Sequence, residues 1–489
     1  MFGPPPRATA PHEPATGRTP APWSRLGLAA AALWCAAWFV VAAHRGGAAW
    51  HFFVLGGGVL ADIDDGSRAG LHVYAEHPLL QIGPLALAAA WGLGRLANGY
   101  SLLAAQLLGA GLGVGVVLLV RRIALRAGVL GGRLAGGVPT GKLLVASACF
   151  VPVWLYAAVA SVHLDDVLAL TFGLSAVALV QSGRPVWAGL AVAAAVDSKP
   201  WALPLGVVLL ALAPRRTRAV GVGVAAAGVA AGWLPFFLAD PQTVRALHYT
   251  IVNTALSGLR VLHVTSARTP PWDRPLQALV GTALGVAALR RGRLTGLPLL
   301  VMASRVALDP GTNRYYTAGV AAGALLWDLT GSRRRWPWWS LTVLLGLHLA
   351  RWVPTLDPLH GPAVVAFAVA AAASVLLGRS DQRRGRAKVH DRVPEPDRSP
   401  PPGEVSAARR GFDAPDHGPP GPPGPPGPAA FLEQLQQPGR AGHELDEGHV
   451  EQVHEVAGRT EAKLAVRQAP SGGRTHGCST PSVSPTTCD

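Results

Sequence analysis

The stretch WHFFVLGGGVLADIDDGSRAGLHVYAEHPLLQIGP occupies residues 50–84, and the rest of the chain is organised around it. It is crowded with acids, histidines, aromatic residues and prolines, whereas most of the chain around it, up to residue 378, is Ala, Leu, Val and Gly. The apolar run 25–43 before it is long enough to cross a bilayer at about 1.5 Å per residue. A protein that needed only a membrane anchor would not need this polar loop. We therefore interpret 50–84 as part of the first loop outside the membrane.

Composition and charge placement indicate a protein that crosses the bilayer many times. Half of the 489 residues are hydrophobic, 15% are charged, and the formal net charge is +15. The basic residues lie in short clusters between apolar runs, as the positive-inside rule describes for membrane proteins. This placement argues against a nucleic-acid-binding protein. The clusters are Arg121/Arg122/Arg126/Arg133/Lys142, Arg215/Arg216/Arg218, Arg290/Arg291/Arg293, Arg333/Arg334/Arg335 and Arg379/Arg383/Arg384/Arg386/Lys388. We expect membrane lipids, and no nucleic acid, as partners.

The apolar runs predict an all-α, polytopic membrane helix bundle over residues 25–378, with about ten full spans and one broken helix pair. The expected spans are 25–43, 101–120, 143–160, 167–181, 219–238, 276–289, 294–308, 315–329, 337–353 and 361–378. Residues 1–24 and 379–489 are rich in Pro and lack long apolar runs, so we expect a disordered arm and a disordered tail. Both termini are predicted to be cytoplasmic, in a protein of the plasma membrane.

One apolar segment, 78–94, looks like a further span but conflicts with the charge pattern. The loop before it is expected outside, and the basic loop 121–142 is expected inside. An odd number of crossings must lie between these loops, and 101–120 already supplies one. We therefore predict that 78–94 form an interfacial or re-entrant helix.

A second segment, 186–213, is apolar but interrupted by Asp197-Ser198-Lys199-Pro200. We predict two short helices, 186–196 and 201–213, that enter from the cytoplasmic side and return to it. Backbone that is broken within a membrane must line protein or a wet cavity. Asp197 and Lys199 are therefore expected to face a cavity, where they either pair with each other or bind a ligand such as a lipid phosphate.

Two polar motifs on the outer side invite a functional interpretation. His163-Leu164-Asp165-Asp166 begins a predicted helix, and one acid there could simply cap it. Two adjacent carboxylates exceed what a cap needs, and ionisable groups at the membrane edge of a bundle point to function. The second motif is DPGTNRYY, residues 309–316. Its Asp-Pro-Gly sequence is typical of a simple turn. Arg314 could instead bind phosphate oxygens through two N–H groups, and Tyr315 could stack on a sugar ring.

These features resemble the GT-C superfamily of integral-membrane glycosyltransferases, in particular the bacterial polyprenyl-phosphate-mannose-dependent mannosyltransferases. The resemblance covers about residues 25–378. It rests on the large outer loop with a helix near His77-Pro78, the carboxylates after the third span, the paired short helices around Lys199-Pro200-Trp201, and the final spans with short outer loops.

The resemblance implies an inverting transfer of a sugar, expected to be mannose, from a polyprenyl-phosphate donor to an extracytoplasmic lipid or glycan acceptor. No cofactor and no metal are expected. Enzymes of this kind usually carry an acceptor-activating Asp early in the first outer loop, where this chain has Ala48-Ala49-Trp50-His51. The nearest acids, Asp62, Asp64 and Asp65, come more than ten residues later. Either one of these acids or His51 acts as the base, or the protein has lost activity.

The implied site faces the outside of the membrane. The catalytic candidates are Asp64 or Asp65 as the base, with Asp165 and Asp166 supporting the base or the acceptor. The phosphate-binding candidates are Lys199 and Arg314, and the substrate-binding candidates are His77, His163 and Tyr315.

Two other classes of function fit parts of the sequence. A transporter or flippase would also need broken helices and charges within the membrane, but the two halves show no internal repeat, and the polar groups lie on one side. An inactive membrane scaffold is the third class, and the missing early Asp favours it.

Overall fold

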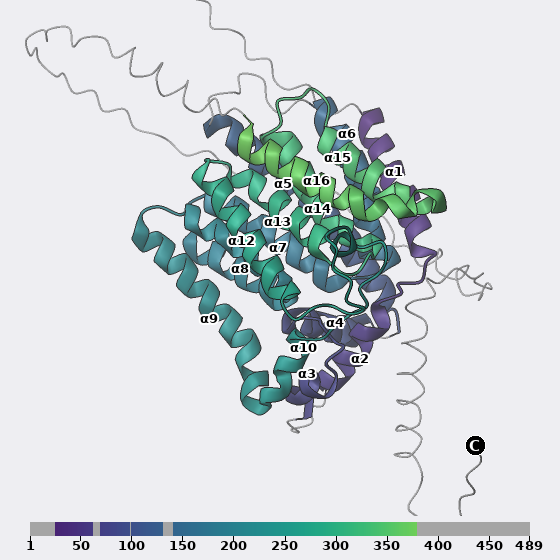
Figure 1. Cartoon of the computed structure of the whole chain (residues 1–489), viewed down its shortest axis with the longest axis vertical. Helices are drawn as coiled ribbons and strands as arrows, with labels where there is room; N and C mark the ends of the chain where they lie inside the picture. Colours follow the sequence, from purple (N-terminus) through teal and green to yellow (C-terminus); the bar gives the residue numbers. More distant parts are fainter. Residues whose placement is uncertain (1–24, 62–68, 98, 131–139, 379–489) are drawn as a thin grey trace, which may run out of the picture. The chain divides into compact units, whose positions relative to one another are not determined.

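The computed structural model describes residues 25–61, 69–97, 99–130 and 140–378, and most of these residues are helical (Figure 1). The described residues contain no strand, only an isolated antiparallel bridge between Val252 and Arg268. The all-α prediction is therefore confirmed. The expected arm 1–24, the expected tail 379–489, and the candidates Asp64 and Asp65 lie outside the described residues.

The first half of the chain contains the longest helices. They are α1 (Arg25–Ala43), α2 (Trp50–Ala61), η1 (Ala69–His72), α3 (Val73–Glu76), α4 (Pro84–Ala97), α5 (Ser101–Leu130), α6 (Thr140–Leu155), η2 (Tyr156–Ala160), α7 (Leu164–Gln181), α8 (Pro185–Ser198), η3 (Pro200–Ala211), α9 (Arg215–Ala239), η4 (Pro241–Thr243) and α10 (Val244–Leu247). The second half contains α11 (Gly258–Val261), α12 (Asp273–Arg290), η5 (Leu294–Gly296), α13 (Leu297–Leu308), η6 (Arg314–Tyr316), α14 (Thr317–Thr330), α15 (Trp338–Thr342), η7 (Val343–His348), η8 (Leu349–Trp352), η9 (Pro354–Leu359) and α16 (His360–Leu377).

The helices support the prediction of a membrane protein. Among the described residues, five helical segments are long and apolar enough to cross a bilayer, namely Ser101–Gly128, Thr140–Ala160, Leu164–Gln181, Arg215–Ala239 and Pro354–Leu377. Shorter apolar helices, including Ala29–Ala43 and Leu294–Leu308, accompany them. Many apolar side chains on α5 and α9 stay exposed, as expected for helices that face lipid rather than water.

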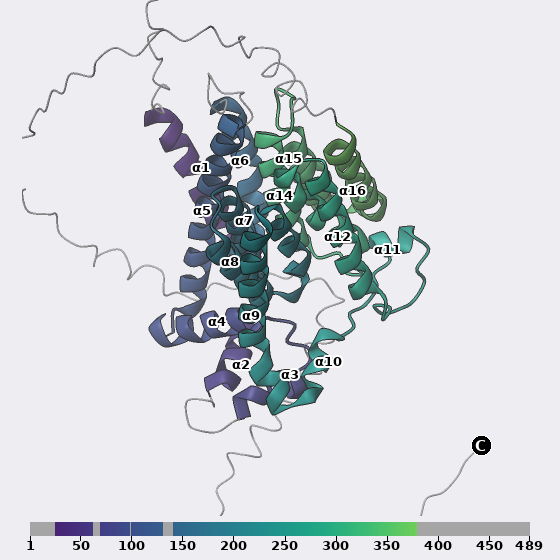
Figure 2. The same ribbon diagram turned by 90° about the vertical axis from the view of Figure 1, so that its left-hand side faces the viewer.

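Two hydrophobic cores divide the described chain. The larger one lies between the long helices and contains residues such as Phe150, Trp154 and Leu325. The smaller one is built around Phe53 and Tyr74, and it joins α2, α3 and α4 to the nearby ends of α5, α7 and α9. In Figures 1 and 2, α2, α3 and α10 gather at the lower end of the bundle with α4 above them. The loop that contains 50–84 therefore has a core of its own.

Helix α4 differs in direction from the long helices, since Figure 2 shows it lying across the direction of α5. Its 14 residues correspond to about 21 Å, which is shorter than the hydrocarbon layer of a membrane. This arrangement agrees with an interfacial segment at 78–94.

The basic connectors meet at one end of the bundle, which we call the basic end. Lys142 Nζ donates to the Ser332 carbonyl at 3.0 Å. Arg126 donates to the Ser182 hydroxyl, and Arg293 donates to carbonyls at the end of α16, including that of Val375. One expectation was wrong here: the basic segment 121–142 is not all loop, because α5 continues to Leu130. Arg126, within this extension, donates to the Ser182 hydroxyl and the Ala178 carbonyl at the end of α7, which stabilises the extension.

The broken helix pair exists, and it forms a hairpin. Its two open ends, Pro185 and Leu212, both lie against Gly221 of α9. Lys199 has an extended backbone (φ −155°, ψ 119°) and separates α8 from the 3-10 helix η3. At about 1.5 Å and 2.0 Å per residue, the two arms are about 21 Å and 24 Å long. The turn at Lys199 therefore reaches the opposite end of the bundle, where α7 begins.

Candidate functional site

The first turn of α7 carries two buried carboxylates. Asp165 and Asp166 are 1% and 5% exposed. His163 is the N-cap residue but makes no side-chain capping bond. Asp165 Oδ1 accepts the backbone N–H of Asp166 at 2.9 Å. Helix capping thus uses one carboxylate oxygen, and the remaining ones are left for other partners.

The hairpin turn supplies a partner to each carboxylate. Lys199 Nζ forms an ion pair and hydrogen bond with Asp165 Oδ2. The indole Nε1–H of Trp201 donates to Asp166 Oδ1 at 2.8 Å. We call His163, Asp165, Asp166, Lys199 and Trp201 the carboxylate cluster. It joins the start of α7 to the only break in the α8–η3 hairpin.

The expected alternative for Lys199, an ion pair with Asp197, is wrong. Because Lys199 is extended, its side chain turns toward α7, whereas Asp197 in the last turn of α8 lies against Gly232 of α9. Asp197 Oδ1 is buried and has no hydrogen-bond partner among the described residues. Lys199 is therefore already neutralised by Asp165, which makes it a weaker candidate for binding a phosphate than its sequence position indicated.

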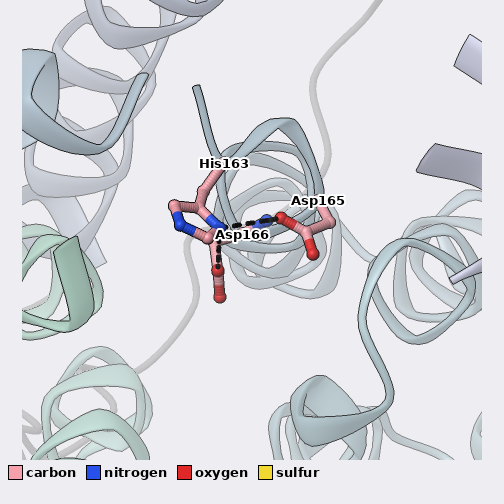
Figure 3. A group of neighbouring side chains, drawn as sticks. All are labelled: His163, Asp165 and Asp166. Carbon is pink, nitrogen blue, oxygen red and sulfur yellow. Dashed lines mark hydrogen bonds and ion pairs between the residues drawn. The ribbon is translucent and has the colours of Figure 1, made fainter. Parts of the chain in front are cut away.

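His163 lies between the two carboxylates. Its Nδ1 is 3.7 Å from Asp165 Oδ1 and 3.8 Å from Asp166 Oδ2, and Figure 3 shows both contacts meeting at the imidazole ring. The ring stacks on Tyr315 with 3.4 Å between centroids and 21° between planes. The stacking fixes the orientation of the imidazole. His163 and Tyr315, both expected to bind substrate, are therefore adjacent.

Arg305 is a buried cation beside this cluster that the sequence analysis missed. Its guanidinium lies 4.6 Å from the Trp201 ring centroid and 4.9 Å from the Tyr316 ring centroid. It also lies 3.8 Å from Asp309 Oδ2. A signal was present, because an arginine within the apolar run 294–308 is the kind of membrane charge that points to function.

Asp309 connects Arg305 to the beginning of α12. Arg274 lies 3.6 Å from the same oxygen, Asp309 Oδ2. The neighbouring Asp273 accepts a hydrogen bond from Gln277 at 2.8 Å. Asp273 precedes the apolar run 276–289, and its burial, together with the nearby charge of Asp309, raises its pKa to about 7 although Arg274 and Gln277 oppose the shift.

A second group of charges lies next to the carboxylate cluster. Arg45, just after α1, and Arg314 place their guanidiniums 4.3 Å and 4.8 Å from the ring centroid of Trp352. We call these three residues the guanidinium cluster. Arg314 also donates to the Arg351 carbonyl at 2.7 Å. Within the described part of the chain, neither Arg45 nor Arg314 forms an ion pair, and Trp352 is 39% exposed.

The turn η6 joins the two clusters. Its three residues point to three partners: Arg314 to Trp352, Tyr315 to His163, and Tyr316 to Arg305. Tyr315 and Tyr316 contact each other edge to face, with 4.5 Å between centroids. This explains why an arginine and two tyrosines follow the Asp-Pro-Gly turn, which a plain turn does not require.

The structure thus brings together most of the predicted site residues. Five of them are in contact, directly or through one neighbour: Asp165, Asp166, His163, Lys199 and Tyr315. Arg314 lies beside them in the guanidinium cluster. His77 is placed elsewhere, at the end of α3 in the segment that forms the smaller core, where its carbonyl accepts the Leu80 N–H. Arg45 and Arg305 were not among the predicted site residues, and the structure places them beside the others.

A comparison with models of known protein families, with curated proteins and with solved structures found no match for this chain.

Proposed function

We propose that this protein is a membrane glycosyltransferase that moves a sugar, with mannose as the expected one, from a polyprenyl-phosphate donor to a lipid or glycan acceptor. The observation that carries the proposal is the contact between a buried carboxylate cluster and a partly exposed guanidinium cluster through one turn, Arg314–Tyr316. Transfer from a lipid phosphate needs a proton acceptor and cations for the departing phosphate at one place.

Asp166 is the carboxylate best placed to accept the proton. Its Oδ1 is held by Trp201, and its Oδ2 is buried without a hydrogen-bond partner among the described residues. An acceptor hydroxyl would donate to that oxygen. Asp165, by contrast, has Lys199 and the backbone N–H of Asp166 as partners. Asp64 and Asp65 stay predictions for the same role.

Arg45 and Arg314 are the proposed phosphate ligands. Two guanidiniums without an anionic partner can bind several phosphate oxygens. Exposed apolar residues, including Val353 and Leu356, directly follow Trp352 in the chain. They would contact the hydrocarbon of a lipid donor.

The proposed reaction conserves atoms and charge. The acceptor oxygen forms a bond to the anomeric carbon, and the bond from that carbon to the phosphate oxygen breaks. The hydroxyl proton moves to Asp166, and polyprenyl phosphate leaves with the bonding electron pair, stabilised by the guanidinium cluster.

The proposal includes a topology of about ten crossings with the site on the outer face of the plasma membrane. The separation of the basic end from the carboxylate cluster supports it, because basic connectors favour the cytoplasm. The hairpin turn at Lys199 then lies near the outer face.

Purified protein incubated with radiolabelled polyprenyl-phosphate mannose and a membrane lipid extract tests the proposal. We expect labelled product, and we expect Asp166→Asn to reduce its rate by about 10²–10⁴-fold, the usual contribution of a general base. The matched control is Asp240→Asn, because Asp240 also lies beside a histidine, His72, at 3.4 Å but outside the cluster. Labelled donor that crosses a vesicle membrane without forming product would instead support the flippase.

A further inference from the structure

We infer that His163 Nδ1, Asp165 Oδ1 and Asp166 Oδ2 bind one divalent metal ion. This site goes beyond the proposed glycosyl transfer, and it changes the expectation of a metal-free protein. It uses Asp166 Oδ2, the oxygen proposed there as the proton acceptor, so the ion and the proton would occupy that oxygen in turn. The three ligand atoms come from one turn of chain and lie within 4.8 Å of one another (Figure 3).

The distances fit an ion between the three atoms. Bonds of about 2.0–2.2 Å from imidazole nitrogen or carboxylate oxygen to a divalent metal allow two ligand atoms to lie up to about 4 Å apart. The imidazole nitrogen lies 3.7 Å and 3.8 Å from the two carboxylate oxygens. The two carboxylate oxygens lie within 4.8 Å of each other, so the carboxylates must turn toward each other to bring all three atoms to bonding distance.

The surroundings hold the ligand atoms in place. Lys199 binds the other oxygen of Asp165, and Trp201 binds the other oxygen of Asp166. Tyr315 stacks on the imidazole ring. Such outer contacts, which orient a ligand by its far atom, are typical of metal sites. They leave the inner oxygens turned toward the imidazole nitrogen.

Asp166 supplies the independent reason for a bound cation. It is 5% exposed, and its Oδ2 has no hydrogen-bond partner in the part of the chain that is described. The nearest lysine is engaged with Asp165, and Arg305 is paired with Asp309 at 3.8 Å. A buried carboxylate oxygen without a donor is costly. A metal ion between the carboxylates and the histidine would remove that cost.

The ligand set indicates the class of ion. One imidazole and two carboxylates suit Mn²⁺ or a similar transition ion better than Ca²⁺, which takes six to eight oxygens. Three protein ligands also leave open positions, where water or a substrate hydroxyl can bind.

Binding is tested with Mn²⁺ itself on the full-length protein in detergent, after treatment with chelator and without donor or acceptor. Free Mn²⁺ is followed by electron paramagnetic resonance, because the signal of the hydrated ion is lost on binding. We expect one Mn²⁺ per chain, and at least a tenfold weaker affinity in both Asp166→Asn and His163→Gln. Asp240→Asn, which changes the separate His72–Asp240 pair, is expected to bind as the unaltered protein does.

Two results would overturn this site: no saturable Mn²⁺ binding by the unaltered protein, or equal affinity in all three variants. Gel filtration of each variant shows whether it is folded, and two independent substitutions protect against a folding defect in one. The experiment uses no sugar, so it separates this site from the proposed function. Mn²⁺ binding without transferase activity would contradict only the transferase, and activity without Mn²⁺ binding would contradict only the metal site.

Discussion

The carboxylate cluster and the guanidinium cluster are neighbours, yet they handle charge in opposite ways. In the first, Lys199 neutralises Asp165, which is almost completely buried, while the Lys199 side chain is 15% exposed. In the second, Arg45 and Arg314 share one aromatic ring, Trp352, and have no carboxylate among the described residues. In the first cluster the charge of Asp165 is compensated within the fold and only Asp166 Oδ2 lacks a hydrogen-bond partner among the described residues, whereas the second has two like charges near the surface.

This difference indicates what each cluster contributes. A buried pair is tolerated because each charge compensates the desolvation of the other. Two cations at an exposed tryptophan gain little from the fold itself, since surface charges contribute weakly to stability. Their arrangement is therefore better explained by an anion that binds from outside. Changes in the Lys199–Asp165 pair should therefore affect stability, and changes in the guanidinium cluster should affect ligand binding.

The largest expected effect is that of Lys199→Met on stability. The change leaves Asp165 buried without its cation, and breaking one partner of a buried pair costs about 3–5 kcal/mol. We expect a much lower temperature of thermal unfolding in detergent, measured by intrinsic tryptophan fluorescence, and a lower yield of monodisperse protein.

The double variant Lys199→Met with Asp165→Asn is the matched control, because it removes both charges. We expect it to recover much of the lost stability, since replacing both members of a buried pair is often nearly neutral. If the single and double variants were equally unstable, the ion pair with Asp165 would not be the reason for the effect.

The all-helical class and most of the apolar helices could be predicted from the sequence, because apolar runs and basic connectors act locally. Helix α2 and the division of the expected span 337–353 into α15, η7 and η8 were not predicted. The break at Lys199-Pro200 could also be predicted locally, because a proline inside a helix disrupts its hydrogen bonding. The end of α5 was missed because its last turns are basic and amphipathic rather than apolar. The length of such a helix depends on the neighbours that its side chains reach, and the sequence alone does not show them.

The sequence predicted most of the residues that form the site, but not which of them pair with each other. Adjacent acids and a lysine between short helices were recognisable, but their pairing was not. Asp197 is two residues from Lys199, and the sequence therefore favoured an ion pair between them, whereas Asp165 is 34 residues away. The choice depends on an extended backbone at one residue, which turns the lysine toward α7. Arg45 was missed for a similar reason, because only the tertiary fold brings it to Trp352.

A smaller effect is expected for Arg45→Gln, this time on ligand binding rather than stability. The loss of one partly solvated guanidinium should raise the KM for the polyprenyl-phosphate donor about tenfold, which corresponds to about 1.4 kcal/mol. The kcat should fall as well, because the same guanidinium stabilises the departing phosphate, and Arg314 should retain part of that stabilisation. Initial rates at increasing donor concentration measure both constants, and the difference should shrink at high salt.

Arg245→Gln is the matched control for this prediction, because Arg245 is another exposed arginine in α10 outside the guanidinium cluster. It should leave the KM unchanged. Equal donor KM values in the unaltered protein and in Arg45→Gln would show that the paired guanidiniums do not bind the donor.

The last prediction concerns the pH dependence of stability caused by Asp273, a buried carboxyl outside both clusters. It has a hydrogen bond from Gln277 but a second carboxylate, Asp309, nearby, and its pKa is raised to about 7. Because the folded state holds this proton more tightly than the unfolded chain, stability should be greater near pH 5 and fall as the pH rises toward 7. One proton gives a slope of at most about 1.4 kcal/mol per pH unit. Asp273→Asn should flatten the thermal-unfolding profile between pH 5 and 8, and an unchanged slope would place the titration on another group.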